Sequence, residues 1–384
     1  ILHNVYLVKG RRMFMKVAII STFDTFFDRV DLLKEYYQSK DAEVTVITSD
    51  YSHRLKEKYR NEKADVQIPV REYKKNLSVD RLRSHDEFAK KTKVYLETLL
   101  PDIIHCIIPC NSLCQTLSEY KQNHKVQLIF DVNDLWPESL PVGNFKYRFP
   151  FTLWKNRRDK YIDNANIVLS ECNYFKEILH KTKDPKWHTL LFAKKVMPLN
   201  THASLKPDEL NFCYLGSINN IIDIELIIDF LCACSNARKV GLHIIGGGEK
   251  KELLISGLKN HAVNVIDHGY IFDQDEKQHI LDQCNYGLNI MKDTVMVGLT
   301  MKSMDYMCGG LPLINTIKGD TAKICDEYQV GYNINKNNLN DIVSKISLET
   351  VEENQIKREK IKNIFISKFT QKAFNETLER IGIL

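Results

Sequence analysis

Residues 286–320, YGLNIMKDTVMVGLTMKSMDYMCGGLPLINTIKGD, contain two apolar strands, each followed by a loop that opens a helix. Strand–loop–helix units in succession indicate a parallel sheet. Ligands bind such sheets outside the carboxyl ends of the strands, so the two loops are expected to lie side by side at a binding crevice. The loops carry Lys292, Lys302 and Asp305 together with small residues. This combination suits a ligand that has phosphates and hydroxyl groups.

The same alternation of strand and helix extends over the rest of the chain. Residues 79–100 predict a long helix that ends before a proline. Its apolar residues at helical spacing predict the buried face, namely Leu82, Phe88, Tyr95, Leu96 and Leu99. Apolar strands are expected at residues 15–22, 43–50, 64–70, 102–109, 127–132 and 167–171, and then at residues 211–217, 241–248 and 263–271.

These elements predict an α/β protein with two doubly wound, Rossmann-like domains that face a cleft. The polar stretch 200–209 has no periodicity and is interpreted as the linker. The predicted organisation is an extension at 1–14, a first domain at 15–200 and a second domain at 201–366, followed by a helix at 367–384 that packs back on the first domain.

Composition excludes several classes of protein. The 54 basic and 49 acidic residues leave a net charge of only +5, which does not suit a nucleic-acid-binding domain. The 10 cysteines show no zinc-site spacing, so reduced core cysteines are expected. No apolar run approaches the ~20 residues of a membrane span, and residues 1–12 do not have the order of a secretory signal. We therefore expect a cytoplasmic protein.

Two strand ends in the second half are rich in glycine. IIGGGEKKEL at residues 244–253 and YLGSINN at residues 214–220 each leave a strand with glycines at the turn. Such a turn lets backbone N–H groups and a helix N-terminus meet an anion. A tight strand-to-helix turn explains the glycines equally well, because the G-x-G-x-x-G spacing is missing. Their confinement to the second half predicts a nucleotide diphosphate held there.

The order of these segments resembles that of a GT-B glycosyltransferase of family 4 (glycosyltransferase group 1). The resemblance covers nearly all of the chain after the first dozen residues. In the first half, DLWPES and DNANIVLSE resemble segments of bacterial polysaccharide transferases. In the second half, the matching residues are the pair Gly216 and Ser217, the turn Gly246, Gly248 and Glu249, the segment Gly269, Tyr270 and Ile271, and KSMDYMCGGLPLI at residues 302–314.

The resemblance implies transfer of a sugar, with retention, from a nucleotide-diphosphate sugar (expected to be a UDP-sugar) to a saccharide or lipid-linked saccharide. It implies a role in bacterial surface polysaccharide synthesis, such as capsule or exopolysaccharide, and no metal or other cofactor. The implied donor residues are Gly216, Ser217, Gly246, Gly248, Tyr270, Ile271, Lys292, Gly298, Leu299, Thr300, Lys302, Asp305, Gly319, Asp320 and Thr321.

The chain departs from the family pattern at the donor site. Asp305 stands where the second of two family glutamates is expected, and Val297 where the first is expected. The usual basic pair is missing, so Lys302 is the first choice to stabilise the leaving diphosphate and Lys292 the second. Alternatively, both lysines are solvated surface residues and Asp305 is a partner of Lys302 on the helix.

The acceptor is expected in the first domain, where Asn133 replaces the histidine of many relatives. Asp131, Asp134 and Glu138 cluster at one strand end, and paired carboxylates suit general-base catalysis or hydroxyl binding, although loop capping explains them equally well. We name Asp134 and Glu138 as catalytic candidates. The candidates for acceptor binding are Phe23, Asp24, Asn133 and Trp136.

The stretch 145–158 interleaves aromatic and basic residues, which suits an anionic membrane surface. The expected location is thus the inner face of the cell membrane, as a peripheral protein. A helix that is part core and part solvated explains the stretch equally well. Two rival functions also stay open: a nucleotide-sugar 2-epimerase, and a catalytically degenerate binding partner of another transferase.

Overall fold

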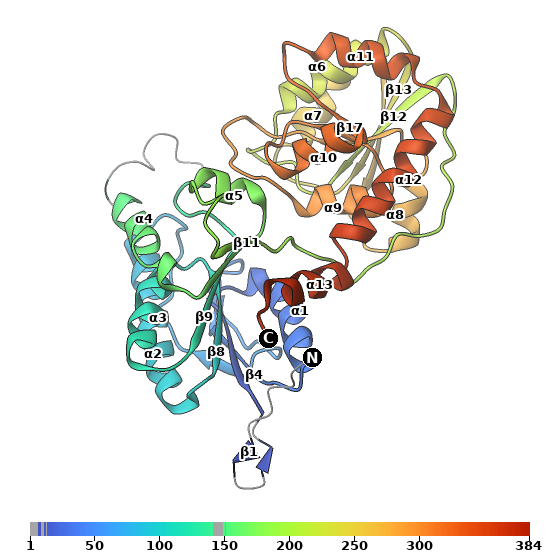
Figure 1. Ribbon diagram of the computed structural model, residues 1–384. Coiled ribbons are helices and arrows are strands. Elements are labelled where there is room, and N and C mark those ends of the chain that lie inside the picture. The colour runs from blue at the N-terminus through green and yellow to red at the C-terminus, as the bar shows by residue number, and fades with distance from the viewer. Residues whose placement is uncertain (1–6, 9–10, 13, 141–148, 150) are drawn as a thin grey trace. The chain divides into compact units, whose positions relative to one another are not determined.

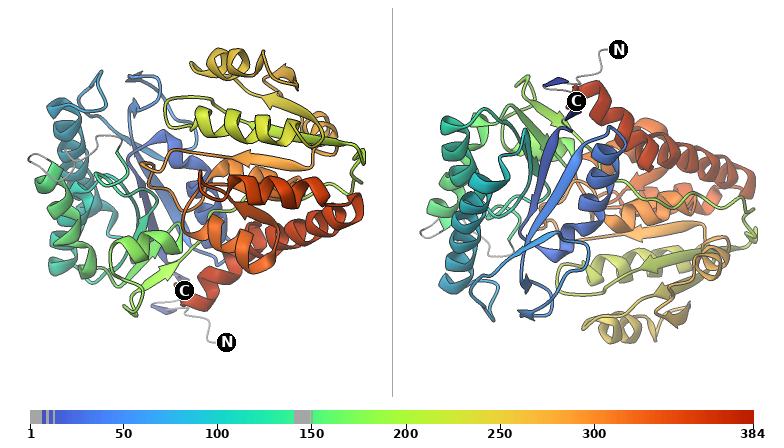
Figure 2. Two further views of the ribbon diagram at one scale, coloured as in Figure 1. Left: turned by 90° about the horizontal axis from the view of Figure 1, so that it is seen from above. Right: turned by 90° about the horizontal axis from the view of Figure 1, so that it is seen from below.

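The computed structural model describes residues 7–8, 11–12, 14–140, 149 and 151–384. The chain divides into two compact units. The first unit comprises residues 1–171, 175–193 and 375–384, and the second comprises residues 172–174 and 194–374. Each unit is built around one parallel sheet with helices on both of its faces (Figures 1 and 2). The predicted pair of doubly wound α/β sheets is therefore confirmed.

The sheet of the first unit has seven strands, and its strand order reverses between β3 and β8. Every neighbouring pair in it is parallel. The strands, in spatial order, are β11 (Trp187–Thr189), β10 (Ile167–Ser170), β9 (Gln127–Val132), β8 (Ile103–Ile108), β3 (Lys16–Ser21), β4 (Glu43–Ser49) and β7 (Val66–Ile68).

The sheet of the second unit has six parallel strands, and its order reverses between β12 and β15. Such a reversal opens a crevice at the carboxyl ends of the two strands, where ligands bind in folds of this kind. The strands are β14 (Val263–Gly269), β13 (Lys239–Ile245), β12 (Glu209–Leu215), β15 (Tyr286–Asn289), β16 (Leu313–Asn315) and β17 (Gly331–Asn333).

Helices cover both faces of each sheet, so the central strands are buried runs of apolar residues; in β8 all positions are buried. The first unit contains α1 (Phe27–Gln38), α2 (Val79–Leu99), α3 (Ser112–Asn123), α4 (Phe151–Asp159) and most of α5 (Asn173–Ile178), whose first two residues cluster with the second unit. Next come α6 (Ile224–Ser235), α7 (Lys251–Leu258), α8 (Gln274–Leu281), α9 (Met301–Cys308), α10 (Asp320–Tyr328), α11 (Leu339–Leu348), α12 (Val351–Lys368) and α13 (Gln371–Ile381).

The edge strands β11 and β17 were not predicted, because each has only three residues and no apolar run. The buried face of α2 was predicted only in part. Phe88 and Leu96 are fully buried as expected, whereas Leu82, Tyr95 and Leu99 are only half-buried. The helix instead buries the polar side chains Arg81, Ser84, His85 and Thr92. A stripe of apolar residues could not show this face, because α2 packs its polar residues inward.

Two further features belong to the chain as a whole. The division between the units falls at residues 193 and 194, and residues 375–384 cluster with the first unit, where Lys40 pairs with Glu379 at 2.6 Å. The short β1 (Leu7–Val8) and β2 (Arg11–Arg12) pair as an antiparallel hairpin. Among the described residues, every helix is too short or too polar to cross a membrane.

Candidate functional site

A cavity of about 330 Å³ lies at the reversal point of the second sheet. We call it the switch-point pocket. Its wall comes from the loop after β12, from the residue that follows β15 by two positions, and from the first turns of α9. These are the loops that residues 286–320 were expected to bring to the sheet edge. The lining residues are Leu215, Gly216, Ser217, Asn219, Ile221, Ile222, Met291, Thr300, Met301, Lys302 and Asp305.

Lys302 is the second residue of α9, and the Oγ1 of the N-cap residue Thr300 accepts a hydrogen bond from Ser303 N at 3.0 Å. The Lys302 ammonium lies 3.7 Å from the centre of the Tyr214 ring. Its Nζ is buried and has no hydrogen-bond partner among the described residues. Burial lowers the pKa of Lys302 to about 7. A buried ammonium at the positive end of a helix, without a counter-charge among the described residues, is costly, and an anion in this pocket would offset that cost.

Asp305 also lines the pocket, one turn further along α9. Its Oδ1 lies 2.7 Å from Nζ of Lys194 and 3.8 Å from Nζ of Lys277. The alternative in which Asp305 pairs with Lys302 therefore does not describe this structure. Two lysines of the same unit hold the Asp305 carboxylate, and Nζ of Lys302 has no hydrogen-bond partner among the described residues.

The glycines of the two strand ends bring the loops into backbone contact. Gly246 and Gly248 follow β13 with φ of +133° and +132°. A Cβ on Gly246 would lie 2.2 Å from the carbonyl oxygen of Gly216, and a Cβ on Gly248 would lie 2.4 Å from that of Ile218. Of the two alternatives for these glycines, close packing of neighbouring turns is what the geometry shows. They shape the wall of the pocket from behind Gly216 and Ser217.

The loops after β15 and β16 are also tied together. The Gly298 carbonyl accepts hydrogen bonds from Thr321 N and Thr321 Oγ1, both at 2.9 Å. The Asp320 carboxylate accepts hydrogen bonds from the backbone N–H groups of Asn173 and Tyr174 in the same unit. A Cβ on Gly319 would lie 2.5 Å from Cβ of Tyr174. These residues therefore support the crevice through packing and hydrogen bonds.

The remaining predicted donor residues lie outside the lining of the pocket. Lys292 is exposed, whereas Leu299 is buried. Tyr270 is exposed and stacks on Phe272 with 6.5 Å between ring centres, and Ile271 between them is half-buried. Val297 is half-buried and lines no part of the switch-point pocket. The structure thus brings together Gly216, Ser217, Thr300, Lys302 and Asp305 from the predicted set.

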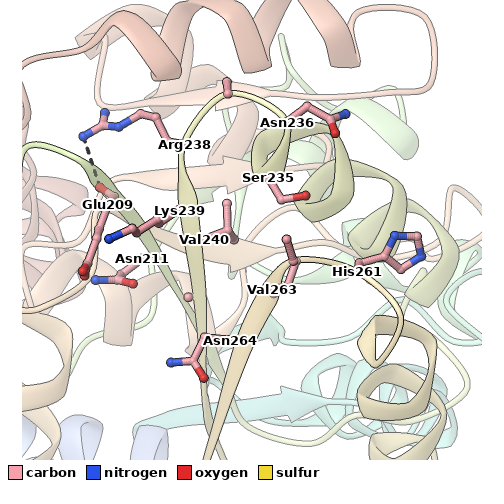
Figure 3. A pocket seen from close by; sticks show the side chains of 13 residues that line it. Glu209, Asn211, Ser235, Asn236, Arg238, Lys239, Val240, His261, Val263 and Asn264 are labelled. Carbon is pink, nitrogen blue, oxygen red and sulfur yellow. Dashed lines mark hydrogen bonds between the residues drawn. The ribbon is translucent and has the colours of Figure 1, made fainter.

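A larger cavity of about 670 Å³ lies at the opposite edge of the same sheet (Figure 3). It is lined by the first residues of β12, β13 and β14, and Figure 3 shows Asn211 and Asn264 beside it. Its one arginine, Arg238, donates Nη2 to the backbone carbonyls of Pro207 and Glu209. Doubly wound sheets bind ligands at the carboxyl ends of their strands, whereas this cavity lies at the amino ends. The Arg238 guanidinium is also already hydrogen-bonded to the backbone. The larger volume of this cavity therefore does not make it the candidate site.

In the first unit, the three predicted carboxylates have different hydrogen-bond and ion-pair partners. Asp131 accepts Nε and Nη2 of Arg29 at 2.6 and 2.8 Å, and Nε2 of His105 lies 3.3 Å away. Burial alone would raise the pKa of Asp131, but the Arg29 charge and the two hydrogen-bonding partners lower it to about 2. Asp131 is therefore the centre of a buried ionic network and not a free acceptor of protons.

Glu138 and Asp134 differ in their partners and in the direction in which their pKa values are shifted. Arg158 holds both oxygens of Glu138 at 2.9 and 2.7 Å and lowers its pKa against the effect of burial. Asp134 accepts the Ser139 hydroxyl at 2.5 Å, and the described residues place no cation within ion-pair distance of it. Burial raises the pKa of Asp134. Of the three carboxylates, Asp134 is the one whose pKa moves toward that of a useful base.

The predicted acceptor residues gather with other rings at the carboxyl ends of β3 and β9. Phe23 and Trp136 lie 5.3 Å apart between ring centres, and Asn133 Nδ2 donates to the Asp131 carbonyl at 3.1 Å. Asp24 accepts the backbone N–H of His53 at 3.3 Å. Two polar residues there were missed from sequence, Arg81 and His85. Their spacing of four residues on one helix face was the available signal.

The aromatic and basic stretch is described at residues 149 and 151–158. In α4, Trp154 and Arg158 are buried, and Arg157 forms an ion pair with Asp86. Lys155 lies 3.4 Å from Glu138. The described part therefore corresponds to a helix that is part core and part solvated, and residues 145–148 and 150 lie outside the described residues.

Comparison with known proteins concerns the fold. No family model and no curated protein matches the chain. Among solved structures, sucrose-phosphate synthase from Thermosynechococcus elongatus has a TM-score of 0.68 at 13% identity, covering 96% of this chain and 98% of that one. The lipopolysaccharide outer core galactosyltransferase WaaB, in its apo form, has a TM-score of 0.61 at 15% identity, covering 96% and 99%.

A third neighbour is HepE from Anabaena in complex with UDP, with a TM-score of 0.65 at 13% identity, covering 97% of this chain and 100% of that one. This chain has the GT-B fold. The resemblance predicted from the sequence is confirmed at the level of the fold, over nearly the whole length of the chain and of each neighbour. Within that fold, the switch-point pocket occupies the crevice of the second doubly wound sheet.

Proposed function

We propose that this protein is a glycosyltransferase that moves a sugar from a nucleotide-diphosphate sugar to a saccharide acceptor. The observation that carries the proposal is the Lys302 ammonium, which is buried in the switch-point pocket without a partner among the described residues. A diphosphate supplies the missing negative charge at a place where the α9 N-terminus also favours it. The GT-B fold supports this choice of ligand class.

The leaving group explains how such a pocket would promote transfer. Breaking the bond between sugar and diphosphate leaves negative charge on the diphosphate. Lys302 and the first-turn N–H groups of α9, which have no partner within the helix, would stabilise that charge. Preorganised charge of this kind takes the role that a metal ion has elsewhere, so we propose a reaction that needs no metal or other cofactor.

The finer assignments are proposals of the same kind. Structural neighbours were solved with UDP and with UDP and glucose, which supports a UDP-sugar as donor. The likeness to a lipopolysaccharide galactosyltransferase supports a role in bacterial surface polysaccharide synthesis. We further propose retention of configuration, a saccharide or lipid-linked acceptor, and a peripheral position on the inner face of the cell membrane.

Within the first unit, we propose that Asp134 binds or deprotonates the acceptor hydroxyl. Its pKa is raised by burial, whereas the pKa of Glu138 is lowered by Arg158. A carboxylate with a raised pKa is the better base near neutral pH. Glu138 is then a positioning residue that holds α4 through Arg158.

The test is release of the nucleoside diphosphate from a panel of nucleotide sugars, with and without saccharide and lipid-linked acceptors. Turnover should require a nucleotide sugar and rise with the right acceptor. Lys302→Ala should lower the rate about 100-fold or more, since one preorganised donor is worth that much. Lys292→Ala is the matched control, because Lys292 is exposed and outside the pocket lining, and its rate should be unchanged. Full activity of Lys302→Ala would refute the site.

A catalytically degenerate binding partner is the second candidate. Val297 stands in place of a family glutamate, and Asp305 is occupied by Lys194 and Lys277. Both observations favour a pocket that binds a nucleotide without turning it over. UDP binding with no turnover on the full panel would establish this candidate. Conversion of a nucleotide sugar into its 2-epimer without any acceptor and without release of the diphosphate would instead indicate an epimerase.

A further inference from the structure

A third, smaller cavity of about 180 Å³ lies in the first unit, where the start of α2 meets α4. We call it the α2–α4 pocket. Its wall is largely apolar, from Leu77, Val79, Leu82, Phe151 and Trp154, and it has a single charged lining residue, Arg81. Leu77 and Val79 are exposed, so the apolar wall continues to the surface.

Arg81 is buried deeply but is not fully bonded. Its side chain is 2% exposed, and its Cζ lies 3.8 Å from the centre of the Trp136 ring. Nη1 donates to the Asn76 carbonyl at 2.8 Å. Nε and Nη2 are buried and have no hydrogen-bond partner among the described residues. Burial lowers the pKa of Arg81 to about 10, so its charge persists at neutral pH.

The unused atoms of Arg81 are the ones that bind anions best. Nε and Nη2 form one edge of the guanidinium, which can make two parallel hydrogen bonds to a carboxylate or phosphate. Arg29 in the same unit uses this edge on Asp131, at 2.6 and 2.8 Å. No described carboxylate fills the corresponding place at Arg81, and a buried donor left unpaired is costly.

A second polar side chain lies on the same face of α2. His85 is four residues beyond Arg81 and stacks against Trp136 with 6.2 Å between ring centres. Both ring nitrogens of His85 are buried, and neither has a hydrogen-bond partner among the described residues. His85 is not among the residues that line the α2–α4 pocket. Two buried side chains with unpaired polar atoms on one helix face nevertheless call for an explanation, and a polar ligand is one.

We propose that the α2–α4 pocket binds an anionic group carried on an apolar chain. The Nε and Nη2 edge of Arg81 holds the anion, while Leu77, Val79 and Phe151 contact the chain. This proposal rests on the proposed transferase function and adds the class of the acceptor. The acceptor is an amphipathic anion, such as a phosphate ester of a lipid. A neutral free saccharide does not match a buried guanidinium beside apolar walls.

The experiment measures binding of three probes to the full-length protein by titration calorimetry: hexyl phosphate, hexyl glucoside and inorganic phosphate. Hexyl phosphate should bind at least tenfold more tightly than either of the others, because each probe lacking one half loses either the charge-assisted hydrogen bonds or the apolar contact. Equal binding of hexyl glucoside would overturn the anion site, and equal binding of inorganic phosphate would overturn the apolar part.

Two variants locate the site. Arg81→Gln and Val79→Asp should each weaken hexyl phosphate binding about tenfold or more. Val79 is 59% exposed and tolerates substitution, so it keeps the test valid if Arg81→Gln fails to fold. The controls are Arg83→Gln and Val94→Asp, exposed positions of α2 outside the pocket, which should bind like the wild type.

Unchanged binding by Val79→Asp would overturn the assignment. UDP binding is measured in parallel on every variant, because the switch-point pocket belongs to the other unit. Loss of hexyl phosphate binding with normal UDP binding would leave the proposed transferase intact. Failure of the wild type to bind UDP would count against the transferase and not against the α2–α4 pocket.

Discussion

At the scale of single residues, the unusual feature is Lys302, a buried lysine with no counter-charge among the described residues. Nζ of Lys302 touches the Tyr214 ring and lies in the first turn of α9, where a cation is disfavoured. Such an arrangement lowers stability in the absence of a ligand, and it is retained in enzymes when the ligand supplies the opposite charge.

The first prediction concerns Lys302→Met. Because the substitution replaces an unbalanced buried cation by an apolar chain of similar length, the ligand-free protein should melt at a higher temperature. The same variant should no longer be stabilised by UDP. Lys292→Met, at an exposed position, should change neither property. Thermal melts with and without UDP check this, and a lower melting temperature for Lys302→Met alone would contradict it.

The second prediction is the pH dependence of UDP binding. The pKa of Lys302 is about 7, so above pH 7 the side chain is mostly neutral. Lys302 must then take up a proton from solution when UDP binds. Affinity should therefore fall up to about tenfold per pH unit above 7. The ordinary pKa of lysine is about 10.4, so the unfolded chain holds more protons between pH 7 and 10, and ligand-free stability should rise with pH there. Calorimetry in buffers of different ionisation enthalpy measures the proton uptake, which Lys302→Met should abolish.

At the scale of elements, the pocket depends on two strand-end loops that touch backbone to backbone. Gly246 and Gly216 meet where β13 and β12 end, and the Gly216 N–H donates to the Ile245 carbonyl at 2.8 Å. The loops therefore act as one rigid wall beside Lys302, and the glycines serve this contact.

The third prediction compares Gly246→Ala with Gly382→Ala. Both glycines have positive φ, but a Cβ would lie 2.2 Å from Gly216 O in the first case and meet nothing within 4 Å in the second. Gly246→Ala should cost about 1–3 kcal/mol more than its control and should weaken UDP binding. Chemical denaturation and titration check this, and equal costs would contradict the predicted clash with Gly216.

A buried ion pair likewise joins α1 to β9. Arg29 and Asp131 are fully buried and bonded through two hydrogen bonds. The fourth prediction is that Asp131→Ala loses about 3–5 kcal/mol of stability, because it leaves a buried guanidinium without its partner. Asp134→Asn should instead keep its stability and lose transfer.

Acid unfolding provides an independent measure of the same pair. The pKa of Asp131 is about 2 in the folded state and about 3.9 in unfolded chains. The pair therefore contributes fully above pH 4, and its contribution is lost as the pH falls toward 2. If the free energy of unfolding of Asp131→Ala equalled that of the wild type above pH 4 and fell in the same way toward pH 2, this role for Asp131 would be ruled out.

At the scale of the whole molecule, the two units carry different ligand sites in our proposals. The fifth prediction is that UDP slows amide hydrogen exchange in the second unit, in the loop after β12 and the start of α9. Hexyl phosphate should slow exchange in the first unit, at the start of α2. Mass spectrometry of peptides measures both, and protection of the same peptides by both ligands would contradict separate sites.

Much of the fold and part of the site could be predicted from the sequence. The alternation of apolar strands with helices determined two doubly wound sheets, because a parallel sheet requires a crossover between strands. The glycine pattern and the position of Lys302 after a strand–loop unit predicted the end of the sheet at which we propose that an anion binds. These signals are local, so the chain shows them without its three-dimensional neighbours.

Only the tertiary structure decided which polar groups are satisfied. Asp131, Asp134 and Glu138 have similar surroundings in sequence, yet Arg29 and Arg158 come from distant elements to pair with two of them. Lys302 and Arg81 are ordinary basic residues in the sequence. Only the folded chain shows that Nζ of Lys302, and Nε and Nη2 of Arg81, have no hydrogen-bond partner among the described residues. The sequence by itself predicted at which end of the sheet a ligand would bind. The packing of remote elements decided which charges lie without a partner among the described residues, because charge compensation depends on distance in space.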